Sequence, residues 1–254
     1  MKIAVLVKQI PDPATPYSLD PASHFVVRPA DQVLDDTDRY GIEVGLQLAA
    51  AAGETADVTV YSMGPSGSMQ GIRQALSMGA DAAVVVDDPA LRGAEALLTA
   101  RVLAAAIARH GFDVVVAGTE STDGYSGVVP QQIAELLGVP SLTFARRVEK
   151  TDAGVRIERQ TAAGYDVVEA ATPVVLSVTA GSVEPRYPSF KGIMAAKSKP
   201  VETLTAGDLN VEVSSAQTIR SVEPVPARQA GEVVEDDGEA HLRIIALLEE
   251  RKVV

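Results

Sequence analysis

The sequence predicts an α/β fold in which a parallel β-sheet is covered by helices on both faces. Short apolar segments alternate with longer helical segments through residues 1–140, which is the pattern of βαβ units. The apolar segments are rich in β-branched residues, as at 113–117, which is typical of strands buried on both faces. Glycines that can end a helix follow three of the helical segments, at Gly53, Gly79 and Gly138. Together these observations predict a Rossmann-like sheet.

Each expected strand of this first part is followed by an expected helix. The prolines after the first strand, at Pro11, Pro13 and Pro16, force a loop, and residues 19–30 are expected to form an irregular or short hairpin excursion. The expected strands cover 2–7, 57–63, 82–86 and 113–117, and the expected helices cover 31–52, 69–78, 95–110 and 128–137.

The pattern changes after Ser141 to short, mixed polar and β-rich segments. These segments predict an antiparallel meander, then an apolar strand that returns to the sheet and a short helix. A polar, proline-containing arm precedes a closing amphipathic helix. The fold is therefore expected to carry a small antiparallel extension and a C-terminal arm. The meander covers 143–150, 154–160 and 164–171, the returning strand 173–179, the short helix 193–196, the arm 211–231 and the closing helix 236–251.

Composition excludes several classes of function. The chain of 254 residues is 46% apolar and can bury a substantial core, but its net charge of −12 argues against nucleic acid as a partner. Zero cysteines exclude disulfides and thiolate chemistry, and three scattered histidines predict no metal site. No apolar run reaches the roughly 18 residues of a membrane span, and the apolar run at the N-terminus is too short for a signal peptide. We expect a cytoplasmic protein without direct membrane insertion.

The loop at 118–127 consists mostly of small and hydroxylated residues. Gly118, Gly124 and Gly127 let the backbone approach a ligand, and the amides that open the next helix suit an anion such as phosphate. Neither GxGxxG nor GxxxxGK[ST] is present, so an ordinary strand-to-helix turn is the alternative.

The ends of three expected strands favour the nucleotide interpretation of this loop. Residues 7–8, 62–64 and 118–119 are small, polar or glycine at most positions, and the carboxyl ends of parallel strands meet at one edge of the sheet. Ligands collect at that edge, near the switch in strand order.

A second informative segment covers 184–200. Arg186, Lys191, Lys197 and Lys199 lie among prolines and the aromatic residues Tyr187 and Phe190. Such a cluster suits docking to a partner with an acidic rim, whereas the alternative is a solvated loop that leads into a short helix.

Four motifs in order resemble the β subunit of electron-transfer flavoprotein. They are VLVKQIPD at the N-terminus, SMGPSGSMQGIRQALSMGAD, the central GTESTDGYSG, and EPRY with the following IMAAKSKP. The resemblance covers about residues 1–205. The family's acidic turn is replaced by QTAAG at 160–164, so no carboxylate role is expected there.

The resemblance implies an adenine nucleotide α-hydrolase-like fold and a heterodimer with an α subunit that mainly holds FAD. Electrons would pass from flavin-dependent dehydrogenases, such as acyl-CoA dehydrogenases, to a quinone oxidoreductase. This subunit would bind a structural AMP, would not be an enzyme and would have no catalytic residues, because the cofactor carries the redox chemistry.

The resemblance also implies site residues. Asp123 is expected to brace the central loop or touch the ribose, because a carboxylate repels phosphate. The adenine pocket would use Leu6, Val7, Lys8, Asp35, Asp38, Val60 and Met63. The phosphate loop would use Gly118, Thr119, Glu120, Ser121, Asp123, Gly124, Tyr125, Ser126 and Gly127. The docking residues would be Arg186, Tyr187, Phe190, Lys191, Ile193 and Met194.

Two other functions remain open. One is an electron-bifurcating β subunit with a second FAD in the same pocket. The other is a stand-alone ATP-binding domain, although the SGGxDS loop of pyrophosphatase-type ligases is absent after the first strand. For the electron-transfer subunit we expect residues 1–205 to form the nucleotide-binding domain, with the recognition loop at 184–200. Residues 206–254 would form an arm and helix that contact a partner subunit.

Overall fold

The computed structural model describes all residues except 54, 65–68, 224, 227–230 and 232. Part of the second resemblance motif and part of the expected arm therefore lie outside the described residues. Contacts divide the chain into two units, Met1–Ile219 and Arg220–Val254. Ala206, Leu209 and Val211 pack against the core of the first unit, so the beginning of the expected arm belongs to the α/β unit.

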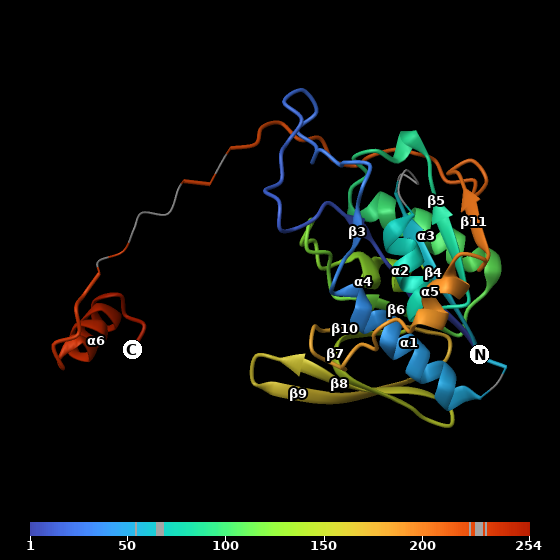
Figure 1. The fold of residues 1–254 in the computed structure, drawn as a ribbon. Coiled ribbons are helices and arrows are strands. Elements are labelled where there is room, and N and C mark those ends of the chain that lie inside the picture. The colour runs from blue at the N-terminus through green and yellow to red at the C-terminus, as the bar shows by residue number, and fades with distance from the viewer. Residues whose placement is uncertain (54, 65–68, 224, 227–230, 232) are drawn as a thin grey trace. The chain divides into compact units, whose positions relative to one another are not determined.

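Among the described residues, nine strands form one sheet in the order β11-β5-β4-β1-β6-β10-β7-β8-β9 (Figure 1). The fold class predicted from the sequence is confirmed. The strands are β1 (Lys2–Leu6), β4 (Asp57–Met63), β5 (Ala82–Val86), β6 (Val114–Gly118), β7 (Ser141–Lys150), β8 (Gly154–Thr161), β9 (Gly164–Ala171), β10 (Val174–Val178) and β11 (Val201–Leu204).

The sheet is parallel from β11 through β7, and β8 and β9 extend it antiparallel. β7 belongs to both parts, since it pairs parallel with β10 and antiparallel with β8. The predicted meander is thus joined to the main sheet through its first strand. β11, which the sequence did not predict, adds a parallel edge next to β5.

The helices cover the two faces of the sheet. One face packs against α1 (Asp38–Ala52) and α2 (Gln70–Met78), and the other against α3 (Ala96–His110) and α4 (Val129–Leu137). Alternate residues of β1 serve the two layers, with Ile3 and Val5 on the first face and Ala4 and Leu6 on the second. A 3-10 turn (Pro89–Leu91) follows β5.

The predicted helix at 31–52 is wrong at its beginning, because α1 begins at Asp38. Two residues before it form β3 (Val33–Leu34), which pairs antiparallel with β2 (Gln9–Ile10). The Asp35 carboxylate accepts hydrogen bonds from the backbone and hydroxyl of Thr37, two residues on. Such local bonds compete with helix formation, so the helix starts only after them.

The predicted short helix at 193–196 begins earlier. α5 (Phe190–Ala196) is capped by Ser189, whose hydroxyl accepts a hydrogen bond from the Gly192 amide at 3.0 Å. In the second unit, α6 (Ala240–Glu250) is shorter than the predicted 236–251 and has no buried residue. No described helix is both long and apolar enough to cross a membrane.

Candidate functional site: a braced loop at the switch in strand order

The strand order reverses at β1. After β1 the chain adds β4 and β5 on one side, and it then returns to place β6 on the other side. A crevice opens outside the carboxyl ends of strands at such a point. Gly118, the last residue of β6, borders this position, since a Cβ atom there would lie 3.1 Å from an Asp38 oxygen of α1.

Asp35 joins the loop after β6 to the segment before α1. Its side chain is fully buried, and one oxygen accepts hydrogen bonds from the Thr122 amide at 2.7 Å and the Thr122 hydroxyl at 3.0 Å. The other oxygen holds Thr37, whose hydroxyl shares its one proton with the Glu120 carbonyl oxygen, 3.3 Å away. Every oxygen of this buried carboxylate is therefore used to fix the loop.

Asp123 is the second brace of the loop. Its buried carboxylate lies 2.6 Å from the Lys8 ammonium and also binds the Arg28 guanidinium. Burial alone would raise the pKa of Asp123, but the two cations outweigh burial and hold the pKa below its usual value. Lys8 also donates from its ammonium to the Ser121 hydroxyl at 3.2 Å. The expected bracing role of Asp123 thus has a concrete geometry.

Asp38 is buried at the beginning of α1. Its carboxylate accepts a hydrogen bond from the Lys8 amide at 2.6 Å. Burial and the neighbouring Asp35 carboxylate raise the pKa of Asp38 well above its usual value, although Lys8 opposes them. The site therefore combines one strongly paired carboxyl group, Asp123, with one whose charged form is disfavoured.

The beginning of α4 is open to an anion. Val128 is the N-cap residue and supplies no side-chain hydrogen bond, and Pro130 lies in the first turn. The first amides of a helix have no partner within the helix and favour negative charge. Gly127 precedes the cap with φ +63°, a conformation that glycine adopts without strain, and its carbonyl accepts from the Gln131 side chain at 3.2 Å.

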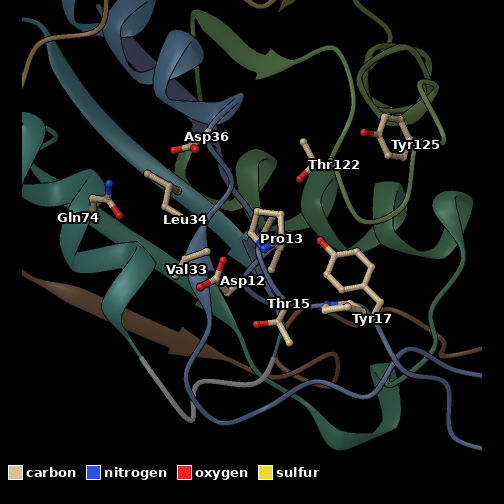
Figure 2. Close-up of a pocket in the computed structure, with 12 residues that line it drawn as sticks. Asp12, Pro13, Thr15, Tyr17, Val33, Leu34, Asp36, Gln74, Thr122 and Tyr125 are labelled. Atoms are coloured by element: carbon tan, nitrogen blue, oxygen red, sulfur yellow. The ribbon is translucent and has the colours of Figure 1, made fainter. Parts of the chain in front are cut away.

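A cavity of about 660 Å³ lies beside this loop (Figure 2). Such a volume is within the usual range of small-molecule sites. Figure 2 shows Gln74 and Leu34 on one side of the cavity and the rings of Tyr17 and Tyr125 on the other. Half of the remaining lining residues come from the proline-containing loop that follows β2, namely Asp12, Pro13, Thr15 and Pro16.

The structure brings together only part of the predicted nucleotide set. Lys8, Asp35, Asp38 and the loop at 118–127 are linked by the contacts above. Of the residues predicted to bind the nucleotide, only Tyr125 lines the cavity, and Thr122 of the same loop, which was not assigned, lines it too. Leu6, Val7 and Val60 are buried in the apolar core, and Met63 and Thr119 are half-buried. Among the exposed loop residues are Glu120, Gly124 and Ser126.

Three contributors were missed by sequence reasoning. Arg28 lies in the irregular excursion and pairs with Asp123 across 95 positions, so no local signal could reveal it. Thr122 was inside the singled-out loop but was not assigned. Tyr17 follows the proline cluster, which was the available signal for a fixed loop next to the first strand.

The segment predicted to dock partners presents four exposed apolar side chains. Tyr187 and Phe190 are 79% and 80% exposed, and Ile193 and Met194 are about half exposed. Lys191 is exposed beside them. Arg186, in contrast, is turned toward α1, where its guanidinium binds Glu43.

The same segment is fastened to α2. Lys199 donates to the carbonyls of Leu76 and Ala80, at 3.0 and 2.6 Å, and Arg73 of α2 donates to the Ala196 carbonyl at 2.9 Å. A Cβ atom on Gly192 would lie 2.4 Å from the Ser77 carbonyl oxygen. α5 therefore lies closely against α2, and its exposed apolar side chains stand on a rigid support.

The fold and the braced loop define a Rossmann-like α/β protein with a cavity beside the loop at the switch in strand order. Residues 24–209 match the sequence pattern described as Electron transfer flavoprotein domain. A Mycobacterium tuberculosis protein named electron transfer flavoprotein subunit beta is 41% identical over 263 residues, covering 99% of each chain. A Megasphaera elsdenii protein of the same name is 34% identical over 255 residues, covering 94% of each. The chain therefore belongs to the electron transfer flavoprotein family.

The family predicted from the sequence motifs is thus confirmed. The two relatives are named as subunits of an electron carrier, in agreement with the prediction that this chain is not an enzyme, and the designation beta implies an alpha partner. The Mycobacterium match extends past residue 205, where the recognised motifs end. A further relative, from Acetobacterium woodii, is named Caffeyl-CoA reductase-Etf complex subunit CarD and is 32% identical over 243 residues, covering 92% of each chain.

Proposed function

We propose that this chain is the β subunit of a heterodimeric electron-transfer flavoprotein that binds one structural AMP. Its α partner holds the FAD that accepts electrons from flavin-dependent dehydrogenases, such as acyl-CoA dehydrogenases, and passes them toward the quinone pool through a quinone oxidoreductase. This subunit contributes the nucleotide site and the docking segment at 184–200. The C-terminal arm and α6 contact the partner subunit.

The observation that carries the nucleotide proposal is the bracing of the loop at 119–127 by four residues from three separate parts of the chain. Lys8, Arg28 and Asp35 all bind it, and Thr37 holds it from the beginning of α1. A loop fixed in this way presents the open amides of α4 without an ordering cost when a phosphate binds. A bound AMP would then stabilise the folded chain and would not react.

Two kinds of group divide the work in this proposal. Lys8 and Arg28 form ion pairs with Asp123 and so keep the loop in place. Two cations face this one carboxylate, and they therefore also supply a positive field near the phosphate. The phosphate itself would lie on the backbone amides and hydroxyls around Ser126 and Gly127, where the exposed Glu120 carboxylate, 3.2 Å from the position of a Cβ atom on Gly127, would have to turn away. The adenine would lie toward the cavity beside Tyr125.

The proposal is tested by counting cofactors. The chain is co-expressed with the α subunit encoded by its source organism, and the purified heterodimer is denatured to release bound nucleotides. Flavin is measured by absorbance and AMP by chromatography with mass detection. One FAD and one AMP per heterodimer are expected.

Each other count has a distinct meaning. Two FAD and no AMP would replace the proposal by the bifurcating β subunit. A flavin-free chain that purifies alone and hydrolyses ATP would replace it by the stand-alone ATP-binding domain. One FAD with no nucleotide of any kind would refute the AMP site and leave only the family assignment.

A further inference from the structure

One residue of the docking segment, Arg186, makes three hydrogen bonds to a single residue of α1, Glu43. The Arg186 guanidinium donates to both oxygens of Glu43, with Nε 2.7 Å from Oε2 and Nη2 2.9 Å from Oε1. The Arg186 amide donates to the same Oε2 at 3.1 Å. One carboxylate on a helix therefore fixes both the side chain and the backbone of a residue that lies in no helix or strand.

Glu43 is itself fixed in position by burial and by a neighbouring side chain, so it can fix the position of Arg186. Its side chain is 5% exposed, and Gln47, one turn further along α1, donates to its Oε1 at 3.0 Å. Burial would raise the pKa of Glu43, but the bonds from Arg186 and Gln47 keep the pKa below its usual value. The carboxylate is thus ionised at neutral pH, and its partner guanidinium sits in a forked geometry that lysine cannot reproduce.

The contact lies directly before the exposed apolar residues. Tyr187 follows Arg186, and the Arg39 guanidinium of α1 lies 5.6 Å from the centre of its ring. Ser189 then caps α5, which begins with Phe190. Tyr187 and Phe190 therefore lie within four residues of Arg186, so the contact between Arg186 and Glu43 helps to set the direction in which their side chains project from the surface.

We propose that Glu43 is a positioning residue for dehydrogenase docking. Through Arg186 it holds residues 186–190 in the conformation that binds a dehydrogenase. Binding free energy is then not lost to ordering the segment when the complex forms. This inference rests on the proposed docking function of 184–200. Because Glu43 is buried, it cannot touch a dehydrogenase, and any effect of its substitution on docking must pass through the segment.

The experiment measures steady-state reduction of the complete heterodimer by a short-chain acyl-CoA dehydrogenase that reduces the wild-type protein, with butyryl-CoA as the reductant. The KM for the heterodimer is expected to rise at least fivefold in Glu43→Gln, with kcat within twofold of wild type. A purely structural loss would instead lower the amount of active protein and leave KM unchanged. Glu135→Gln, on the exposed surface of α4, is the control for the loss of one negative charge and should keep the wild-type KM.

A double-substituted protein makes the test specific. In a Phe190→Ala background, Glu43→Gln should raise KM by less than twofold, because the anchor that it positions is gone. If Glu43→Gln does not assemble, Glu43→Asp, which keeps the charge on a shorter side chain, should raise KM at least threefold.

The two proposals fail in different ways. A normal KM in Glu43→Gln, or in Glu43→Asp where that variant is used, together with an impaired Phe190→Ala overturns the positioning role alone. So does a Glu43→Gln effect of undiminished size in the Phe190→Ala background. A normal KM in Phe190→Ala itself would remove the docking function on which this inference rests.

Discussion

Truncating Phe190 separates docking energy from folding energy, because so little of this side chain is buried. Phe190 is 80% exposed at the beginning of α5. A fully covered aromatic side chain buries roughly 200 Å², so about 40 Å² is covered within the chain. At about 25 cal/mol per Å², Phe190→Ala should cost about 1 kcal/mol of folding stability.

The exposed part of Phe190 is available to a partner. It amounts to roughly 160 Å², or up to about 4 kcal/mol by the same coefficient, and measured anchors of this type contribute about 2 kcal/mol or more on truncation. Since about 1.4 kcal/mol is a tenfold change, we expect Phe190→Ala to weaken dehydrogenase-driven reduction at least tenfold. Heterodimer assembly and flavin content should stay at wild-type levels.

The assay combines reduction by the dehydrogenase with a melting curve of the same preparation. Tyr165→Ala is the matched control, since Tyr165 is an aromatic residue 50% exposed on β9, at the opposite edge of the sheet from β11. It should leave reduction unchanged in every preparation that assembles. A Phe190→Ala protein that melts several degrees lower but is reduced at the wild-type rate would refute the reasoning and make Phe190 a local packing residue.

The remaining predictions concern the nucleotide site. Gly127→Val and Gly138→Val place a branched side chain at φ +63° and +66°, so each should lose about 1–2 kcal/mol of folding stability to backbone strain. Only Gly127→Val should also lose bound AMP. With AMP it would lose the stabilisation of about 2.7 kcal/mol that a ligand provides at a hundredfold excess over Kd. Nucleotide content and thermal melting with added AMP measure this difference, and full AMP occupancy in Gly127→Val would mean that the site is elsewhere. For Asp38, the raised pKa in the folded protein means that the folded state binds a proton more tightly than the unfolded state, so stability falls as pH rises from the unfolded pKa toward the folded one. Asp38→Asn should therefore melt higher than wild type at pH 8, with a gap that narrows toward pH 4, whereas a gap that widens on acidification would contradict the assigned shift.

Most strands of the parallel sheet could be predicted because their signals are local, whereas the order of the strands came only from the structure. Runs such as those of β1, β5 and β6 are mostly apolar and rich in β-branched residues, and each lies next to a helix with its own apolar face. The two-residue pairing of β2 with β3 has no such signal, since it depends on contacts across more than twenty positions. β11 is similar, because its four residues become a strand only by lying next to β5.

In the candidate site, too, the features with a local sequence signal could be predicted and those that depend on long-range contacts could not. The loop at 118–127 could be recognised from its composition, since glycine and hydroxyl residues between a strand and a helix favour turns and let the backbone approach a ligand. Its bracing could not, because Asp123 finds its cations in Lys8 and Arg28, which lie 115 and 95 positions away. The distribution of charge in a site is therefore a property of the folded chain, and the sequence supplies only the groups that take part.

The four cations of the docking segment show how much this matters for function. By sequence they are equivalent members of one basic cluster. In the structure Arg186 and Lys199 are directed toward partners within the fold, Arg186 toward Glu43 with 46% of its side chain still exposed and Lys199 toward the carbonyls of Leu76 and Ala80. The side chains of Lys191 and Lys197 are exposed and are not directed toward such partners in the contacts above. Inward cations hold the segment in place, and rim cations act mainly on the rate and salt dependence of association. For the proposed docking of a dehydrogenase, we therefore expect electrostatic steering to depend on Lys191 and Lys197, and affinity to depend on the apolar side chains that Arg186 and Lys199 keep in place.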